Sequence, residues 1–249
     1  MSTAMTDQAP HAPPATPPTP RDSTANLDKG FRAAASSAGI GILLLAALAT
    51  FGVLFAVDGL VTPGDASRTA RHIGGSEMLF KLGIVSLLVT AAVDVVVACA
   101  LYRVFRRTSS DVSLLAAVFR LAYATVFVVA VSHLVGALRL LHEPSGAFSA
   151  LQNQARALSE VQAFHDDFSA GLALFGAHLL LVGYLAYGSR FVPRLLAALV
   201  CLAGAGYLFD SLARVLSNGS LPEAATVTFV GEFLLGVWLL AKGRRLTEG

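Results

Sequence analysis

Ionisable side chains within or beside long apolar stretches are the residues of this chain that could do chemistry. A charge in hydrocarbon costs at least about 2.5–3.5 kcal/mol, so residues of this kind are candidates for function. Carboxylates and histidines at such depth are the usual parts of proton and substrate pathways. The candidate intramembrane polar cluster comprises Glu77, Lys81, Asp94, Arg120, His133, His178, Asp210, Arg214 and Glu232.

The spacing of these charges also permits a purely structural interpretation, in which they neutralise one another. An acid four residues before a base lies on the same helix face in the favourable orientation. Asp94 and Arg120 lie on consecutive apolar stretches and form a plausible pair between helices. Pairing of this kind and a substrate or proton site both remain open. The acid-before-base pairs are Glu77 with Lys81 and Asp210 with Arg214.

A metal centre is a weaker alternative. His133, His178, Asp94 and Glu232 are residue types that bind zinc, but no two of them share a helix at a ligand spacing such as H-x-x-x-H. We therefore predict no metal site and no cofactor. Cys99 and Cys201 each lie in an apolar run and are expected to be small buried hydrophobic residues.

The elements that must position these residues are long apolar helices. Of 249 residues, 55% are hydrophobic and 14% are charged, against about 25% charged in soluble domains. A helix needs around 20 residues to cross the hydrocarbon core, and helices satisfy their own backbone groups there. We expect an all-α polytopic membrane protein with six transmembrane helices in an antiparallel bundle. The predicted spans are about 34–57, 78–105, 113–141, 168–187, 195–216 and 224–241.

The distribution of Lys and Arg predicts the orientation. Eleven of them lie at the chain ends and in alternate connections, against three in the other connections, so the positive-inside rule places both termini in the cytoplasm. Residues 1–30 hold six prolines and are predicted to be a disordered cytoplasmic tail preceding a membrane domain over 31–245. Residues 148–164 repeat apolar positions every three or four residues. They predict an amphipathic extracytoplasmic helix, either flat on the interface or packed over the bundle mouth.

The composition and the spacing of small residues indicate what this chain can associate with. A net charge of +2 is too low for a nucleic-acid binder, whereas the apolar spans imply membrane lipid as the surroundings. Small residues four apart allow close approach of helices, within the chain or between copies in a homo-oligomer. Such pairs are Ala35 with Gly39, Ser37 with Gly41, and Ala173 with Ala177.

Seven motifs follow one another along the chain. They are Thr62-Pro63-Gly64-Asp65-Ala66, the run 76–84, Ala100-Leu101-Tyr102, Phe119-Arg120-Leu121, the run 183–194, the run 206–211, and Gly231-Glu232 through Lys242-Gly243. Together they resemble an uncharacterised family of bacterial six-span membrane proteins, a domain of unknown function, number four-three-eight-six. The resemblance covers about residues 34–243, and it implies a fold and a bacterial cytoplasmic membrane but no reaction. This chain has Tyr123 where the family often has an acidic residue.

Three hypotheses for function follow. The leading one is a non-catalytic membrane protein, structural or sensory, with mutually paired charges. The second is a small transporter or proton-coupled permease using Glu232, Asp210 and His178. The third is an intramembrane metal-dependent hydrolase.

Overall fold

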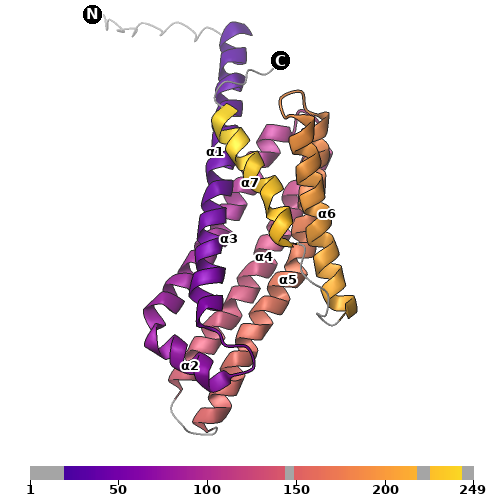
Figure 1. The fold of residues 1–249 in the computed structure, drawn as a ribbon. Coiled ribbons are helices and arrows are strands. Elements are labelled where there is room, and N and C mark those ends of the chain that lie inside the picture. The colour runs from indigo at the N-terminus through magenta and orange to yellow at the C-terminus, as the bar shows by residue number, and fades with distance from the viewer. Residues whose placement is uncertain (1–19, 144–148, 218–224, 243–249) are drawn as a thin grey trace, which may run out of the picture.

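Helices make up nearly all of the structure, a computed structural model that describes residues 20–143, 149–217 and 225–242 (Figure 1). Within those ranges there is no β-strand, which confirms the all-α class. The elements are α1 (Pro20–Thr50), the π-helix η1 (Phe51–Val57), the 3₁₀ turn η2 (Asp58–Leu60), α2 (Ala66–Gly75), α3 (Glu77–Phe105), α4 (Ser110–His142), α5 (Ala150–Gly188), α6 (Arg194–Ser217) and α7 (Ala225–Lys242).

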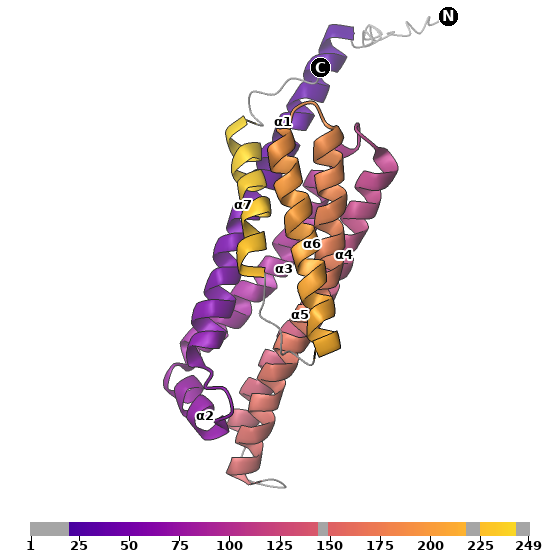
Figure 2. The same cartoon turned by 45° about the vertical axis from the view of Figure 1, so that its right-hand side comes forward.

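The six long helices form a closed ring. In chain order α1 packs against α3, α3 against α4, α4 against α5, α5 against α6 and α6 against α7, and α7 returns to α1. Two views 45° apart show this arrangement, with the start of α1 and the end of α7 at one end of the bundle and α2 at the other (Figures 1 and 2). A ring of helices has an interior, and any polar side chain directed inward is shielded from the surroundings.

Five of the helices in the described part of the chain are long and apolar enough to cross a membrane. The sixth long helix of the ring, α7, has 18 residues. Many large apolar side chains point outward, among them Val96 and Leu202, whose relative exposures are 57% and 63%. A soluble protein rarely exposes apolar surface so widely, whereas lipid accepts it. The structure therefore fits a membrane protein.

Glycines allow the closest contacts in the ring. A Cβ on Gly39 of α1 would lie 2.7 Å from the backbone nitrogen of Leu240 on α7. A Cβ on Gly176 of α5 would lie 2.7 Å from the carbonyl oxygen of Gly204 on α6, and the reverse distance is also 2.7 Å. Side chains are impossible at such distances, so these glycines bring neighbouring helices together. Gly39, predicted as a helix-contact residue, is used within the chain.

Helix α5 differs from the prediction. We expected a separate amphipathic helix over 148–164 and a span over 168–187, but one helix runs from Ala150 to Gly188. It begins with a capping box in which the Ser149 hydroxyl and the Gln152 side chain satisfy each other's backbone N–H groups. The apolar face of its first half is covered by α4 and α2. Because 39 residues extend about 58 Å, α5 is far longer than a bilayer core of about 30 Å.

Two further features were not predicted, a short helix and an earlier start of the first long helix. Helix α2 lies in the first long connection, begins at Asp65, whose carboxylate accepts a hydrogen bond from the backbone N–H of Arg68 (2.8 Å), and packs on α5. Helix α1 begins at Pro20, so residues 20–30 of the predicted tail are helical, and residues 1–19 lie outside the described residues.

Helix α1 ends in a wide turn. In η1 the helix adopts π geometry, which often occurs at functional sites. Just before it, the Ser86 hydroxyl of α3 donates to the carbonyl of Leu48 at 2.9 Å. This turn places Val53 and Leu54 beside the chamber described below, with Val53 half-buried and Leu54 exposed.

Candidate functional site

A single arginine occupies the centre of the ring. Arg120 of α4 is 1% exposed, and its Nε and Nη2 each lie 2.7 Å from Oδ1 of Asp94 on α3. Its Nη1 donates to Oε1 of Glu232 on α7 at 2.9 Å. Helices α4 and α7 are opposite members of the ring and not neighbours, so the Arg120–Glu232 contact crosses the interior. One cation therefore joins carboxylates from two other helices.

A histidine completes this cluster. Nε2 of His178 on α5 lies 3.1 Å from Nη1 of Arg120, and its Nδ1 lies 2.8 Å from the carbonyl oxygen of Ala116. Because a guanidinium can only donate, Nε2 is the acceptor and Nδ1–H donates to Ala116. The guanidinium also lies over the ring of Phe175, 5.2 Å from its centroid. We call Asp94, Arg120, His178 and Glu232 the Arg120 cluster.

Burial makes the members of this cluster dependent on one another. Asp94 is 3% exposed, Glu232 8% and His178 0%. An isolated charge at such depth is costly, and breaking a buried pair by removing one partner leaves the other uncompensated. The four residues therefore tie α3, α4, α5 and α7 together from the inside.

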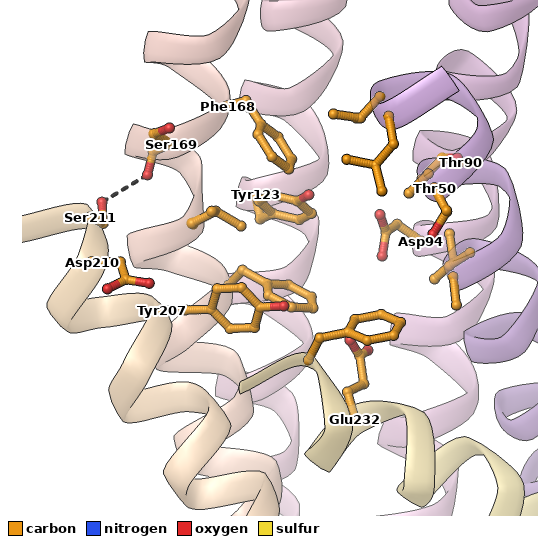
Figure 3. A pocket seen from close by; sticks show the side chains of 18 of the residues that line it. Thr50, Thr90, Asp94, Tyr123, Phe168, Ser169, Tyr207, Asp210, Ser211 and Glu232 are labelled. Carbon is orange, nitrogen blue, oxygen red and sulfur yellow. Dashed lines mark hydrogen bonds between the residues drawn. The ribbon is translucent and has the colours of Figure 1, made fainter. Parts of the chain in front are cut away.

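Three members of the Arg120 cluster, Asp94, Arg120 and Glu232, form part of the wall of a chamber of about 560 Å³. The chamber extends from Asp94 and Glu232 toward the α2 end of the bundle, where His165 Nε2 and Asp58 Oδ1 are 3.2 Å apart. Figure 3 shows Asp94 and Asp210 on opposite sides of this space. The exposed side chains along its edge mark a mouth between α1 with η1 and the first half of α7; they are Thr50, Leu54, Phe229 and Phe233.

Aromatic rings cover much of the remaining chamber wall. The ring of Phe175 packs against Tyr123 at 4.9 Å and against Tyr207 at 5.5 Å between centroids. The Ser211 hydroxyl of α6 donates to the carbonyl of Ser169 on α5 at 2.8 Å, drawn as a dashed line in Figure 3. The chamber thus combines fixed charges with apolar and aromatic surface, as small-molecule sites do.

The structure brings six of the nine predicted polar residues into the Arg120 cluster or to the lining of the chamber. Asp94, Arg120, His178 and Glu232 form the cluster, and the chamber is lined by Asp210 and Arg214, one turn apart on α6. Arg120 and Glu232 come from predicted spans that are not consecutive, and the packing of the ring sets the heights at which they meet.

Glu77 and Lys81 lie apart from the chamber, at the start of α3, where they form the predicted ion pair. Glu77 also contacts Nε2 of His142 at 3.0 Å. Glu77 and His142 are outside the predicted spans 78–105 and 113–141. Hydrogen bonds from Lys81 and then His142 hold the pKa of the Glu77 carboxyl below its usual value. The hydrogen bond to the carbonyl of Leu138, and then Glu77, raise the pKa of the His142 imidazole.

His133 also lies apart from the Arg120 cluster. Its Nδ1 is 2.7 Å from Oε2 of Glu160, and its Nε2 is 3.2 Å from Oδ2 of Asp167, both on α5. We call these three residues the outer histidine cluster. Neither carboxylate was predicted as a site residue, because one helix was expected to end at 164 and another to begin at 168. Their spacing of seven residues places them on one face of a continuous helix, and that signal would have found them.

The described residues contain no group of three His, Cys, Asp or Glu side chains arranged to hold a metal ion. Three of the four residues considered for zinc do converge. The guanidinium of Arg120 lies between Asp94, Glu232 and His178 and contacts all three. The fourth, His133, is held by Glu160 and Asp167.

Comparison with known proteins identifies a family and names no activity. Residues 37–243 match the family described as Domain of unknown function (DUF4386). The chain belongs to this family. It is also 34% identical over 165 residues to an "Uncharacterized protein" of the archaeon Archaeoglobus fulgidus, covering 66% of this chain and 86% of that relative. No solved structure matches the chain. Within this chain Arg120 pairs with two carboxylates, one from α3 and one from α7.

Proposed function

We propose that this protein is a non-catalytic sensory protein of the cytoplasmic membrane that responds to a small molecule held in its chamber. The observation that carries the proposal is a buried ion cluster forming the wall of a chamber whose far edge is exposed. A purely structural set of ion pairs needs no such space beside it. The hydrogen bonds within the Arg120 cluster fix the positions of its side chains, which suits a recognition surface better than a poised catalytic acid or base.

We further propose that α1, α3, α4, α5, α6 and α7 are six antiparallel spans with both termini in the cytoplasm. Supporting this, the start of α1 and the end of α7 lie at the same end of the bundle (Figure 1), the end toward which the sequence places most Lys and Arg. A membrane-impermeant maleimide applied to intact cells should label Ser159→Cys and reach Ser110→Cys only after lysis. Both positions are exposed. The opposite pattern would invert the topology.

A sensor must couple its ligand to a change of shape. Glu232 is the residue through which α7 reaches Arg120 on the opposite side of the ring. A ligand that contacts the Glu232 carboxylate competes for this link and alters how firmly α7 is held. A ligand shifts a conformational equilibrium only through such differential contacts.

Access to the chamber can be tested with a matched pair of serines. Ser211 lines the chamber and Ser86 does not, yet they are 6% and 7% exposed, and each hydroxyl donates to a carbonyl of a neighbouring helix. In a background with Cys99→Ala and Cys201→Ala, we expect 2-aminoethyl methanethiosulfonate to modify Ser211→Cys at least about tenfold faster than Ser86→Cys, because access limits thiol reactivity. Equal rates in the folded protein would overturn the proposed chamber.

A proton-coupled permease is the second candidate, favoured by one specific observation. Asp94 and Glu232 share a single guanidinium at the chamber wall, so one carboxylate can exchange a proton while the other keeps the ion pair. Proteoliposomes loaded with a pH-sensitive dye should then acidify under an imposed potassium diffusion potential, and Glu232→Gln should abolish this flux. A flux equal to that of protein-free vesicles removes this candidate.

A further inference from the structure

We propose that the chamber binds an organic cation, an ammonium group on an apolar body. This inference deepens the proposed sensory function and rests on it. The charges of the lining residues provide the first argument. Among described residues lining the chamber, four carboxylates face two arginines, and His165 lies beside one of these carboxylates. Even with His165 protonated the carboxylates outnumber the cations, so a bound cation balances the chamber. The carboxylates are Asp58, Asp94, Asp210 and Glu232, and the arginines are Arg120 and Arg214.

The hydrogen bonds of the Arg120 cluster give the second argument. Arg120 approaches Asp94 only through Oδ1 and Glu232 only through Oε1. No hydrogen bond from a described residue reaches Oδ2 of Asp94 or Oε2 of Glu232, although both side chains line the chamber. These two oxygens therefore remain as acceptors for the N–H donors of a ligand. A charge-assisted hydrogen bond of this kind is roughly twice as strong as a neutral one.

The same geometry disfavours an anionic ligand. A carboxylate or phosphate would need the guanidinium of Arg120, which is 1% exposed and already donates to Asp94, Glu232 and His178. Arg214 alone would face an excess of acidic groups. The chamber wall therefore discriminates by charge.

The aromatic walls explain the apolar body of the proposed ligand. Six rings line the chamber, from Tyr123, Phe168, Phe175, Tyr207, Phe229 and Phe233. Aromatic faces attract ammonium groups through cation–π interactions and cover attached hydrocarbon. Asp94 and Asp210, on opposite sides of the space in Figure 3, hold the ligand from both ends. A volume of about 560 Å³ is in the range of sites for drug-sized molecules.

Three probes of similar size and different charge test this proposal. Calorimetric titration of the purified protein at neutral pH with benzylammonium, benzyl alcohol and benzoate compares a cation, a neutral molecule and an anion. We expect benzylammonium to bind at least about tenfold more tightly than benzyl alcohol and benzoate to bind most weakly, because each tenfold step is about 1.4 kcal/mol and one charge-assisted bond supplies it. Equal affinities, or tighter binding of benzoate, would overturn the proposal.

A substitution of a chamber residue outside the Arg120 cluster tests whether benzylammonium binds in the chamber. Asp210→Asn should weaken benzylammonium about tenfold and leave benzyl alcohol unchanged, because it removes a charge and little volume. Asp111→Asn, at an exposed position at the other end of the bundle, is the control and should change neither. Equal effects of the two substitutions on benzylammonium would overturn the assignment. Thermal unfolding of each variant confirms that it is folded.

The thiol experiment separates failure of this inference from failure of the proposed function. If Ser211→Cys is modified rapidly while benzylammonium shows no preference over benzyl alcohol, the chamber stands and the cation proposal falls. If Ser211→Cys is as slow as Ser86→Cys, the chamber and the ligand proposal both fall.

Discussion

Two histidine-containing clusters in this molecule have similar chemistry and opposite surroundings. In the Arg120 cluster a guanidinium lies between Asp94 and Glu232 at 2.7–2.9 Å. In the outer histidine cluster the His133 imidazole lies between Glu160 and Asp167 at 2.7–3.2 Å. The side chain of Arg120 is 1% exposed, whereas that of His133 is 31% exposed. The distances resemble each other, and burial is what separates the two clusters.

The difference in burial determines how much an ion pair contributes to stability in each cluster. Near water the dielectric screens the attraction, and pairs contribute about 0–1 kcal/mol. In a dry interior the attraction is stronger, but the cost of losing a partner grows even more, because the remaining charge has no water to solvate it. The Arg120 cluster should therefore be intolerant of substitution, and the outer histidine cluster should be tolerant. The following predictions test that contrast.

Arg120→Met should have the largest effect. It leaves two buried carboxylates without their cation, and we expect the free energy of unfolding to fall by about 3–5 kcal/mol. Thermal unfolding in detergent measures this. Arg139→Met, at an exposed position on the same helix, is the control and should change stability by less than about 0.5 kcal/mol. Similar losses for the two variants would contradict the contrast.

His178→Leu should have the next largest effect. It removes one of the two acceptors of Arg120 Nη1 and the imidazole N–H that donates to the buried carbonyl of Ala116. We expect a loss of about 1–3 kcal/mol. The same substitution at His133 is the comparison and should be milder. If His133→Leu destabilises the protein more than His178→Leu, burial does not set the order.

Glu160→Gln should change stability by less than about 1 kcal/mol, since the pair with His133 is part-exposed. Its effect should also shrink as salt is added, because solvent-exposed charges are screened. Unfolding measured at low and high ionic strength gives both values. A large loss that does not depend on salt would show that the outer histidine cluster behaves as a buried one.

The smallest effect concerns His142, at the exposed end of α4. Its pKa is raised by the carbonyl of Leu138 and by Glu77, so its contribution to stability is present below the ordinary pKa of about 6.5 and is lost as pH rises through the raised value. NMR titration of the imidazole should show the raised pKa. Glu77→Gln should lower it only in part, because the Leu138 hydrogen bond remains. An unchanged pKa in Glu77→Gln would exclude the contact.

Much of the fold could be predicted because lipid-exposed helices need long apolar runs. The predicted stretches 78–105 and 113–141 fall within α3 and α4, and the all-α class follows from them. Elements with weak hydropathy were missed. Helix α2 is short and polar, and the continuity of α5 across residue 165 depends on α4 and α2 covering its first half. Hydropathy alone carries no information about such coverage.

The residues of the candidate site could be predicted from their types, but which of them contact one another could not. Asp94, Arg120, His178 and Glu232 were all recognised as buried polar residues, and the Asp94–Arg120 pair was anticipated. The contact of Arg120 with Glu232 was not anticipated. These two residues are 112 positions apart in the sequence, and their contact crosses the centre of the ring. His133 has the same side chain as His178 and yet belongs to the outer histidine cluster.

By itself, the sequence determined that this chain needs a membrane: its apolar helices would be unstable against water, and its few charges would be unstable alone against lipid. Only the tertiary structure decided which charges meet. The ring closes where glycines such as Gly39 and Gly204 let helices approach, and that closure sets the heights at which side chains face one another. Hydrophobic burial is non-directional, so it selects the helices but not their partners. Contact geometry at the helix crossings makes that selection, and it places one arginine between two carboxylates beside an accessible chamber.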